Sequence, residues 1–329
     1  MSQTFHIACR VFVYATWIIS VPVYTLFLVL MYRYRHSDPF KTPFFKILQF
    51  IGPVDMLSTV SSIVDISILR DFWHQLPRWV YIEYDHIFAP IVHYSLYSST
   101  TICCCLVIVL SLHRYTAVAR PTTHKSFWES HWRKFVAASM IVPGILLSPL
   151  LMFDISYAIP DRPSPYPAND SRYMPYPPND GTVRHYLPSP TQWLITTAFA
   201  GLATLVPAIV IGCLYSVILW KAIKNPPSGP NVQWRFTVIG FLLGSPLIVI
   251  AILFFLLIPD LIHPDYVVSL YGVMSAIFTC QNPYLLTLMS GGVRKKWRAF
   301  FGCLPNAVAV VPPTPKAMPH AQPKDHAHG

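Results

Sequence analysis

Long apolar stretches separated by polar, basic or proline-rich breaks dominate the chain. A helix crosses about 30 Å of hydrocarbon with about 20 mostly apolar residues, because each residue adds about 1.5 Å. Stretches of this kind occur at residues 11–32, 44–69, 87–112, 135–157, 192–220, 236–258 and 267–289. The pattern therefore predicts an all-α fold, a bundle of seven transmembrane helices that spans residues 11–303 together with a short juxtamembrane helix.

The composition agrees with this reading and limits the classes of function. Hydrophobic residues make up 53% of the 329 residues and charged residues only 12%, against about 25% charge in an ordinary soluble domain. The chain also lacks the GxSxG, HExxH and Walker motifs that carry hydrolytic or nucleotide chemistry. We therefore predict that it is not an enzyme, with no catalytic residue, metal or cofactor.

The basic residues are distributed unevenly between the breaks. The net charge of +10 comes from 24 Lys and Arg against 14 Asp and Glu, which could signify a nucleic-acid patch or a topological signal. One side of the expected bundle carries the smaller set, Arg10, Arg70, Arg78, Arg162, Arg172 and Arg184. Because the cytoplasmic loops of membrane proteins are the ones rich in Lys and Arg, we predict an extracellular N-terminus (residues 1–10), a cytosolic C-terminus and no nucleic-acid partner.

Two sites of modification are suggested by local motifs. Asn169-Asp170-Ser171 is a glycosylation sequon in the proline-rich loop at 158–190, which we expect to be extended and irregular on the outer face. Such triplets also arise by chance. On the opposite side, Cys303 is a candidate palmitoylation site.

Cys303 follows a short amphipathic segment. Its apolar residues recur at helical spacing, at Trp297, Phe300 and Phe301. With basic residues on the remaining arc, the segment is typical of a helix lying on the inner leaflet, so membrane lipid is an expected partner. The alternative is a simple basic anchor. The tail at 304–329, rich in Pro and Ala, is expected to be disordered and cytosolic.

Polar residues inside the spans are the candidate functional groups, because they are costly in hydrocarbon. Asp55 lies near the middle of the second span, and Asp65 lies ten residues further on. On a regular helix these two side chains would be about 15 Å and about 80° apart. Together with His93, Tyr94, Tyr97 and Thr101 in the outer half of the third span, Asp65 is predicted to line a ligand cavity. Hydrogen bonding between helices is the alternative explanation for these groups.

The end of the third span carries the most specific motif. It reads LSLHRYTAVARP over 110–121 and is followed by Phe127-Trp128. This segment resembles the nematode serpentine chemoreceptors, most closely class V (Srv), with class G (Srg) second. The resemblance extends over the seven-span layout, about 10–303, and implies a seven-transmembrane G-protein-coupled receptor.

The resemblance assigns roles to individual residues, and some positions depart from the pattern. Residues matching the wider rhodopsin-like switch and G-protein-coupling positions are Arg114, Tyr115, Arg120, Tyr215, Asn282 and Pro283. Asp55 matches the acid of the ion or polar pocket. His113 replaces the usual acid or Asn beside Arg114, and Leu286 replaces the tyrosine expected after Asn282-Pro283. Leu96 stands where amine receptors carry Asp, which argues against an aminergic ligand.

These implications define the expected function. The chain would be a multi-pass chemosensory receptor of the plasma membrane, and of the sensory cilium if the resemblance holds. It would bind an unknown small molecule or peptide in an outward-facing cavity and signal to a heterotrimeric G protein. The alternative is a small-solute transporter or channel. The observation behind it is the presence of two acids inside the expected membrane span, Asp55 and Asp65.

Overall fold

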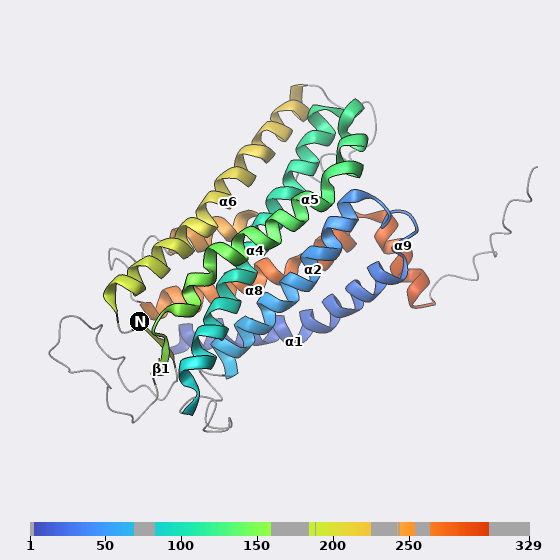
Figure 1. Cartoon of the computed structure of the whole chain (residues 1–329). Coiled ribbons are helices and arrows are strands. Elements are labelled where there is room, and N and C mark those ends of the chain that lie inside the picture. Colours follow the sequence, from blue (N-terminus) through green and yellow to red (C-terminus); the bar gives the residue numbers. More distant parts are fainter. Residues whose placement is uncertain are drawn as a thin grey trace, which may run out of the picture.

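A helical bundle forms the described part of the chain (Figure 1). The computed structural model describes residues 3–68, 83–158, 184–187, 189–224, 242, 244–253 and 264–302. Its α-helices are α1 (Gln3–Arg33), α2 (Pro43–Ser62), α4 (Asp85–Ala119), α5 (Pro121–Leu147), α6 (Pro190–Lys224), the unlabelled helix Gly244–Leu253, α8 (Pro264–Met289) and α9 (Gly291–Phe300). The predicted all-α class is confirmed.

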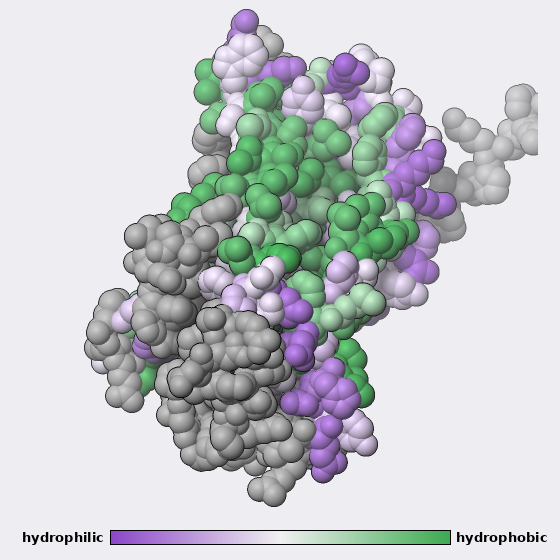
Figure 2. Space-filling model, turned by 60° about the vertical axis from the view of Figure 1, so that its left-hand side comes forward, coloured by the Kyte–Doolittle hydropathy of each residue, from purple (hydrophilic) through white to green (hydrophobic). Residues whose placement is uncertain are grey.

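Five of the described helices, α1, α2, α4, α5 and α6, are long and apolar enough to cross a membrane. The helix α8 coincides with the expected seventh span, and Gly244–Leu253 lies within the expected sixth, whose ends are outside the described residues. Many exposed side chains on these helices are apolar, among them Ile18 and Leu146. Figure 2 shows this apolar flank between hydrophilic ends, the distribution that a lipid environment requires.

The helix α4 lies at the centre of the bundle. It packs against α2, α5 and α6, while α1 packs along α8 and α2 (Figure 1). Large side chains fill the space between these helices, with Phe27 of α1, Ile51 of α2 and Leu106 of α4 fully buried. One end of the bundle carries the strands β1 and β2 and is called here the strand end; the other carries α9 and is called the α9 end.

Helix boundaries differ from the expected spans most clearly in α5. The helix begins at Pro121 rather than near residue 135, because proline is well suited to the first turn and the polar residues that follow are helical without being apolar. At its other end, Pro149 lies in a 3-10 helix, η4 (Ser148–Met152), instead of a continuous span to 157. The helix α2 continues as a π-helix, η1 (Ile63–Ile68).

Two short strands border the loop that was expected to be irregular. The strand β1 (Ser156–Ala158) pairs antiparallel with β2 (Arg184–Tyr186), with Tyr157 opposite His185. The pair packs against the beginning of α4. The loop between the strands, including the sequon at Asn169, lies outside the described residues.

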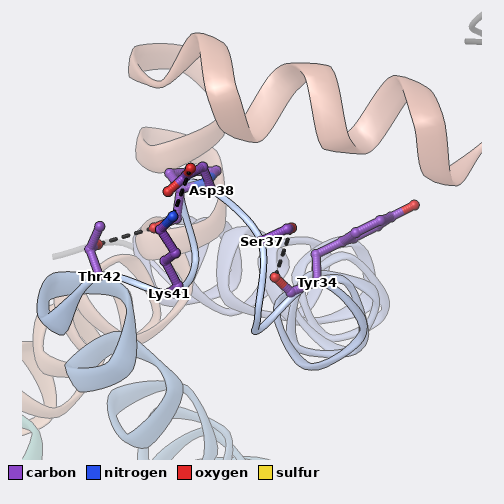
Figure 3. Close-up of polar contacts among 6 residues, drawn as sticks. Tyr34, Ser37, Asp38, Lys41 and Thr42 are labelled. Atoms are coloured by element: carbon purple, nitrogen blue, oxygen red, sulfur yellow. Dashed lines mark hydrogen bonds and ion pairs between the residues drawn. The ribbon is translucent and has the colours of Figure 1, made fainter. Parts of the chain in front are cut away.

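The connection between α1 and α2 is a compact turn close to α9 (Figure 3). Both the backbone N–H and the hydroxyl of Ser37 donate to the Tyr34 carbonyl, at 2.9 and 3.0 Å. Lys41 pairs with Asp38 at 3.0 Å. These local bonds satisfy backbone groups left over at the end of α1 and fix the turn in place.

The expected helix after the seventh span is α9. Ser290 caps it by accepting a hydrogen bond from the backbone N–H of Val293. The indole N–H of Trp297 donates to Thr287 of α8 at 3.0 Å, and the Trp297 ring stacks near Phe27 of α1. The Arg33 guanidinium lies 5.7 Å from the centre of the Phe300 ring. The helix is therefore attached to both α1 and α8.

Two adjacent glycines provide a matched test of how α9 packs on the turn. A Cβ atom added at Gly292 would lie 3.2 Å from Cγ of the rigid Pro39 ring, whereas one added at Gly291 would meet only the Arg294 side chain, at 3.9 Å. We expect Gly292→Ala to be about 1–2 kcal/mol less favourable than Gly291→Ala, because both gain the same helix propensity and only one is overpacked. Faster hydrogen exchange of the α9 amides in Gly292→Ala alone would be the confirming result; equal exchange in the two variants would contradict it.

Candidate functional site

Asp55 is the centre of a buried polar cluster that joins four helices. Its side chain is 2% exposed. One carboxylate oxygen accepts hydrogen bonds from the Tyr24 hydroxyl of α1 and from the amide of Asn282 of α8, the latter at 2.7 Å. The other accepts from the Cys103 thiol of α4 at 3.0 Å. The structure thus brings together the predicted residues Asp55 and Asn282, which are 227 positions apart.

Two partners of Asp55 were missed by the sequence analysis. Cys103 and its neighbour Cys104 are buried in the core, and the Cys103 thiol is a hydrogen-bond donor as well as a packing group. Tyr24 lies in a span that lacks the Asn usual in rhodopsin-like receptors. A tyrosine in the apolar first span was the available signal, because a buried phenol usually finds a hydrogen-bond partner.

Hydroxyl groups extend this cluster toward neighbouring turns. The Ser20 and Tyr284 hydroxyls lie 3.1 Å apart, between α1 and α8. Thr59 donates to the Asp55 backbone carbonyl at 2.8 Å. Because interhelical hydrogen bonds stabilise membrane bundles individually by about 1 kcal/mol, a cluster shared by α1, α2, α4 and α8 is suited to holding one relative arrangement of these helices.

Arg114 lies nearer the α9 end of α4, against aromatic residues of neighbouring helices. Its guanidinium carbon is 3.6 Å from the centre of the Phe44 ring of α2, a cation–π geometry. Arg114 also interacts electrostatically with Tyr215 of α6, which shares a hydrogen bond with Ser111. The adjacent Tyr115 ring lies 5.9 Å from the ammonium group of Lys221. The predicted coupling residues Arg114, Tyr115 and Tyr215 therefore gather between α4 and α6.

The junction of α4 with α5 holds the segment that carried the family resemblance. The indole N–H of Trp128 donates to the Thr116 hydroxyl at 2.7 Å, and a ring nitrogen of His124 lies 3.1 Å from the same oxygen. The His113 ring packs against the rings of Trp128 and His124, at 4.9 and 4.6 Å between centroids. Where an acid is usual, His113 therefore contributes aromatic packing.

Arg120 is exposed at the turn within this junction. Its backbone N–H donates to Thr116 in the last turn of α4, and its carbonyl accepts from His124 in the first turn of α5. The predicted coupling residue is thereby held where two helices meet, with its side chain directed away from the core.

Replacing Trp128 with phenylalanine tests the hydrogen bond at this junction. Trp128 is fully buried, so Trp128→Phe keeps most of the aromatic packing but removes the donor to Thr116. We expect the free energy of unfolding to fall by about 1–2 kcal/mol, measured as a lower melting temperature of the purified protein. Trp132→Phe, on the same helix and half-buried, is the control. A Trp128→Phe protein as stable as this control would exclude a contribution of the Thr116 bond.

Three of the candidate ligand-cavity residues, Asp65, His93 and Tyr97, lie toward the strand end. The Asp65 carboxylate of η1 interacts electrostatically with the phenols of Tyr97, Tyr157 and Tyr271. The His93 ring lies 4.6 Å from the Tyr97 ring, centroid to centroid, and is buried. Tyr157 and Tyr271 were missed by the sequence analysis, because nothing in the spacing relates β1 or α8 to the second span.

The other two candidates lie on the face of α4 that is turned toward α5. The Tyr94 hydroxyl donates to the Gly144 carbonyl at 3.0 Å. Thr101 donates to the Tyr97 carbonyl at 2.8 Å and lines an almost wholly apolar cavity of about 380 Å³ between α4, α5 and α6. Tyr94 and Thr101 are therefore separated from the group around Asp65.

The remaining predicted sites contribute less to this geometry. Pro283 lies inside α8 next to Asn282. Cys303 and the tail at 304–329 lie outside the described residues. Within the described ranges, no group of three or more His, Cys, Asp or Glu residues is arranged to hold a metal ion.

The first half of the chain matches a known family. The model of the family described as serpentine type 7TM GPCR chemoreceptor Srv matches residues 13–169. The predicted class V resemblance is confirmed. The Srv match runs from α1 through α5 and includes Asp55, Arg114 and the α4–α5 junction, whereas Tyr215 and Asn282 lie beyond it. No curated protein matches the chain.

The Srv match and the apolar helices together describe a multi-pass membrane protein. The family is one of serpentine chemoreceptors of the G-protein-coupled receptor class. In the described part of the bundle, polar residues lie at three levels: Asp65 toward the strand end, the Asp55 cluster in the middle, and Arg114 toward the α9 end.

Proposed function

We propose that this protein is a chemosensory receptor that binds a small molecule or peptide at the strand end and signals to a heterotrimeric G protein at the α9 end. The observation that carries the proposal is the position of Arg114, stacked on Phe44 and next to Tyr215, beside the helical junction at Arg120. A half-buried cation in contact with aromatic rings of neighbouring helices can change its contacts when those helices move.

Signalling would follow from a difference in ligand affinity between two arrangements of the bundle. A ligand shifts such an equilibrium only by the amount that it prefers one state. The prolines inside α5, α6 and α8, at Pro143, Pro207 and Pro283, interrupt backbone hydrogen bonds and provide places at which these helices bend. Movement of α6 would separate Tyr215 from Arg114 and open the basic face to the G protein.

The proposed orientation places the strand end outside the cell and the α9 end in the cytosol. The excess of Lys and Arg in the loops at the α9 end supports it. In this orientation Asn169 is available for glycosylation, α9 lies on the inner leaflet, and Cys303 is available for palmitoylation. The plasma membrane, and the sensory cilium by family resemblance, are the proposed locations.

A ligand screen in cells expressing the full chain tests the proposal. Reporters for cAMP, cGMP and calcium would register responses that depend on the receptor, and cells without it provide the control. We expect at least one ligand to evoke a receptor-dependent response that disappears when G-protein activation is blocked. A response that persists under this block would contradict G-protein coupling.

The alternative, a transporter or channel, rests on the membrane acids Asp55 and Asp65. Three side-chain donors from three helices already bind the Asp55 carboxyl group. This arrangement favours a role for Asp55 in holding the helices together over a role in transient cation binding. Ligand-evoked uptake or current in proteoliposomes without G protein would reverse this preference.

A further inference from the structure

A gap between two helices leaves part of α4 uncovered on the flank of the bundle. Both α5 and α6 pack along α4, but among the described helices these two make hardly any contact with one another. Between them lies the cavity of about 380 Å³ that Thr101 borders. Its walls come from α4 and α5, and Phe199 of α6 lies on the remaining side. The packing of α5 and α6 on a shared neighbour therefore leaves a space that the described side chains do not fill.

This cavity is elongated along the helix axes. On α4 its lining residues recur every three or four positions, the spacing of one face of a helix, at Thr101, Cys105, Ile108 and Val109. On α5 they extend from Ala138 to Leu147. At about 1.5 Å per residue, each wall is about 12–14 Å long. Because spanning helices stand within about 20° of the membrane normal on average, the cavity runs in the direction in which lipid chains extend.

Hydrocarbon forms almost the whole surface of the cavity. Ile108, Val109 and Leu147 contribute apolar side chains to it. The Thr101 hydroxyl already donates to the Tyr97 carbonyl at 2.8 Å. A buried water needs about two to four polar partners, which these walls do not offer. The cavity is therefore suited to an apolar occupant that brings no polar group of its own.

The mouth of the cavity opens onto the apolar flank of the bundle. Val142 and Leu146 of α5 and Phe199 of α6 line the cavity and are also exposed. Ile141 and Ile145, which adjoin them on α5, are exposed apolar residues as well. In a membrane, the hydrocarbon chains of lipids surround such a flank. The cavity is thus continuous with the lipid phase, and an occupant can enter it from the side.

The volume of the cavity is suited to one hydrocarbon chain. A dry apolar cavity of about 150 Å³ binds benzene, which has six carbon atoms. In the same proportion, about 380 Å³ accommodates roughly 15 carbon atoms, which is one acyl chain and less than a complete phospholipid. Side chains that border a void lose their dispersion contacts. An acyl chain in the cavity restores these contacts.

We propose that this cavity binds one acyl chain of a membrane phospholipid, which inserts between α5 and α6 and contacts α4. The proposal adds a partner to the bundle and does not depend on the proposed function. The chain would also lie against Pro143, where α5 lacks one backbone hydrogen bond. Small apolar molecules dissolved in the membrane are the competing occupant.

Photocrosslinking of the full chain in phosphatidylcholine nanodiscs tests the proposal. A small fraction of the phosphatidylcholine carries a diazirine in the middle of one acyl chain, and mass spectrometry maps the labelled residues after irradiation. We expect label on Cys105 and Ile108, which line the cavity on α4. Label on the exposed Ile145 of α5 is the reference for general contact with lipid. A small free aryl diazirine, added to separate nanodiscs, represents the competing occupant.

Two adjacent alanines provide the matched variants. Ala137 and Ala138 are both exposed on α5, but only Ala138 lines the cavity. Ala138→Phe should lower the labelling of Cys105, relative to Ile145, at least about fivefold, because the phenyl ring takes the space of the chain. Ala137→Phe, which adds the same ring outside the cavity, should leave this ratio within about twofold of the parent.

Three results would overturn the proposal. The first is the absence of lipid label on α4, and the second is equal labelling of Cys105 in the two alanine variants. If Ala138→Phe does not fold, Val142→Phe at the mouth and Ile141→Phe outside the cavity replace that pair. The third is labelling of Cys105 by the free aryl diazirine but not by the lipid probe, because the cavity would then take small apolar molecules instead of an acyl chain.

Discussion

Replacing Arg114 with alanine should nearly abolish ligand-driven G-protein signalling while the protein still reaches the cell surface. The substitution removes the guanidinium that lies 3.6 Å from the Phe44 ring centre and beside Tyr215. Coupling between distant sites amounts to about 1–3 kcal/mol, or about 5–150-fold in affinity, and we expect a loss at the upper end of this range. Second-messenger response, normalised to surface immunostaining, is the measurement.

Two further variants separate charge from position. Arg133→Ala removes an exposed basic residue of α5, close to Trp132, and should leave signalling within about twofold of the parent, since an exposed charge contributes little. Arg114→Lys keeps the charge but loses the planar group that stacks on an aromatic ring, so we expect an intermediate response. Undiminished coupling in Arg114→Ala would refute the assigned role.

Hydropathy predicted where the helices are, because a helix that crosses a membrane needs about 20 mostly apolar residues, and such stretches are visible in the sequence. It was less informative about where helices begin and end. The first half of α5, from Pro121 onward, is helical but polar, and an apolar-run criterion cannot detect it. The β1–β2 pair depends on contacts between segments separated by a long loop, which no local pattern reports.

The sequence pointed to Asp55 and Arg114 as candidate site residues but not to the side chains that contact them. Arg114 was singled out by resemblance and Asp55 as an acid inside an apolar span, and both lie among neighbouring helices. Tyr24 reaches Asp55 only because of the way α1 packs on α2. Which side chains become neighbours depends on how each helix is rotated about its axis. The pattern of apolar residues defines this rotation poorly when polar and small residues share one face of a helix.

The π-helical backbone at Asp65 was not predictable either. The expected separation of about 80° from Asp55 assumed a regular α-helix, whereas η1 has π geometry from Ile63 onward. Nothing in the local sequence distinguishes such a turn from an ordinary one. The sequence grouped Tyr94 and Thr101 with Asp65, whereas in the structure Tyr94 and Thr101 lie on the face of α4 that is turned toward α5.

Replacing Asp55 with alanine should lower the free energy of unfolding by about 3 kcal/mol. The substitution leaves the buried donors of Tyr24, Cys103 and Asn282 without their shared acceptor, and each unsatisfied buried polar group costs about 1–3 kcal/mol. Relaxation of the neighbouring side chains offsets part of that sum. The measurement is the thermal or denaturant-induced unfolding of the purified protein in a single detergent.

Ser62→Ala is the matched control for Asp55→Ala. Ser62 lies on the same helix and is equally buried, at 2% exposed, but within the described residues its hydroxyl has no hydrogen-bond partner. We therefore expect its removal to change stability by less than about 0.5 kcal/mol. Comparable destabilisation by the two substitutions would mean that burial alone, rather than the hydrogen bonds of Asp55, determines the loss.

A double-mutant cycle then isolates the contact between Asp55 and Tyr24. Tyr24→Phe alone should cost about 1–2 kcal/mol, because buried Asp55 loses one hydrogen-bond donor while the ring of residue 24 keeps its packing. In the background of Asp55→Ala the same change should cost much less, since the acceptor is already absent. Additive losses in the double variant would show that the two groups act independently, and the Asp55 cluster would then not be the unit that joins α1 to α2, α4 and α8.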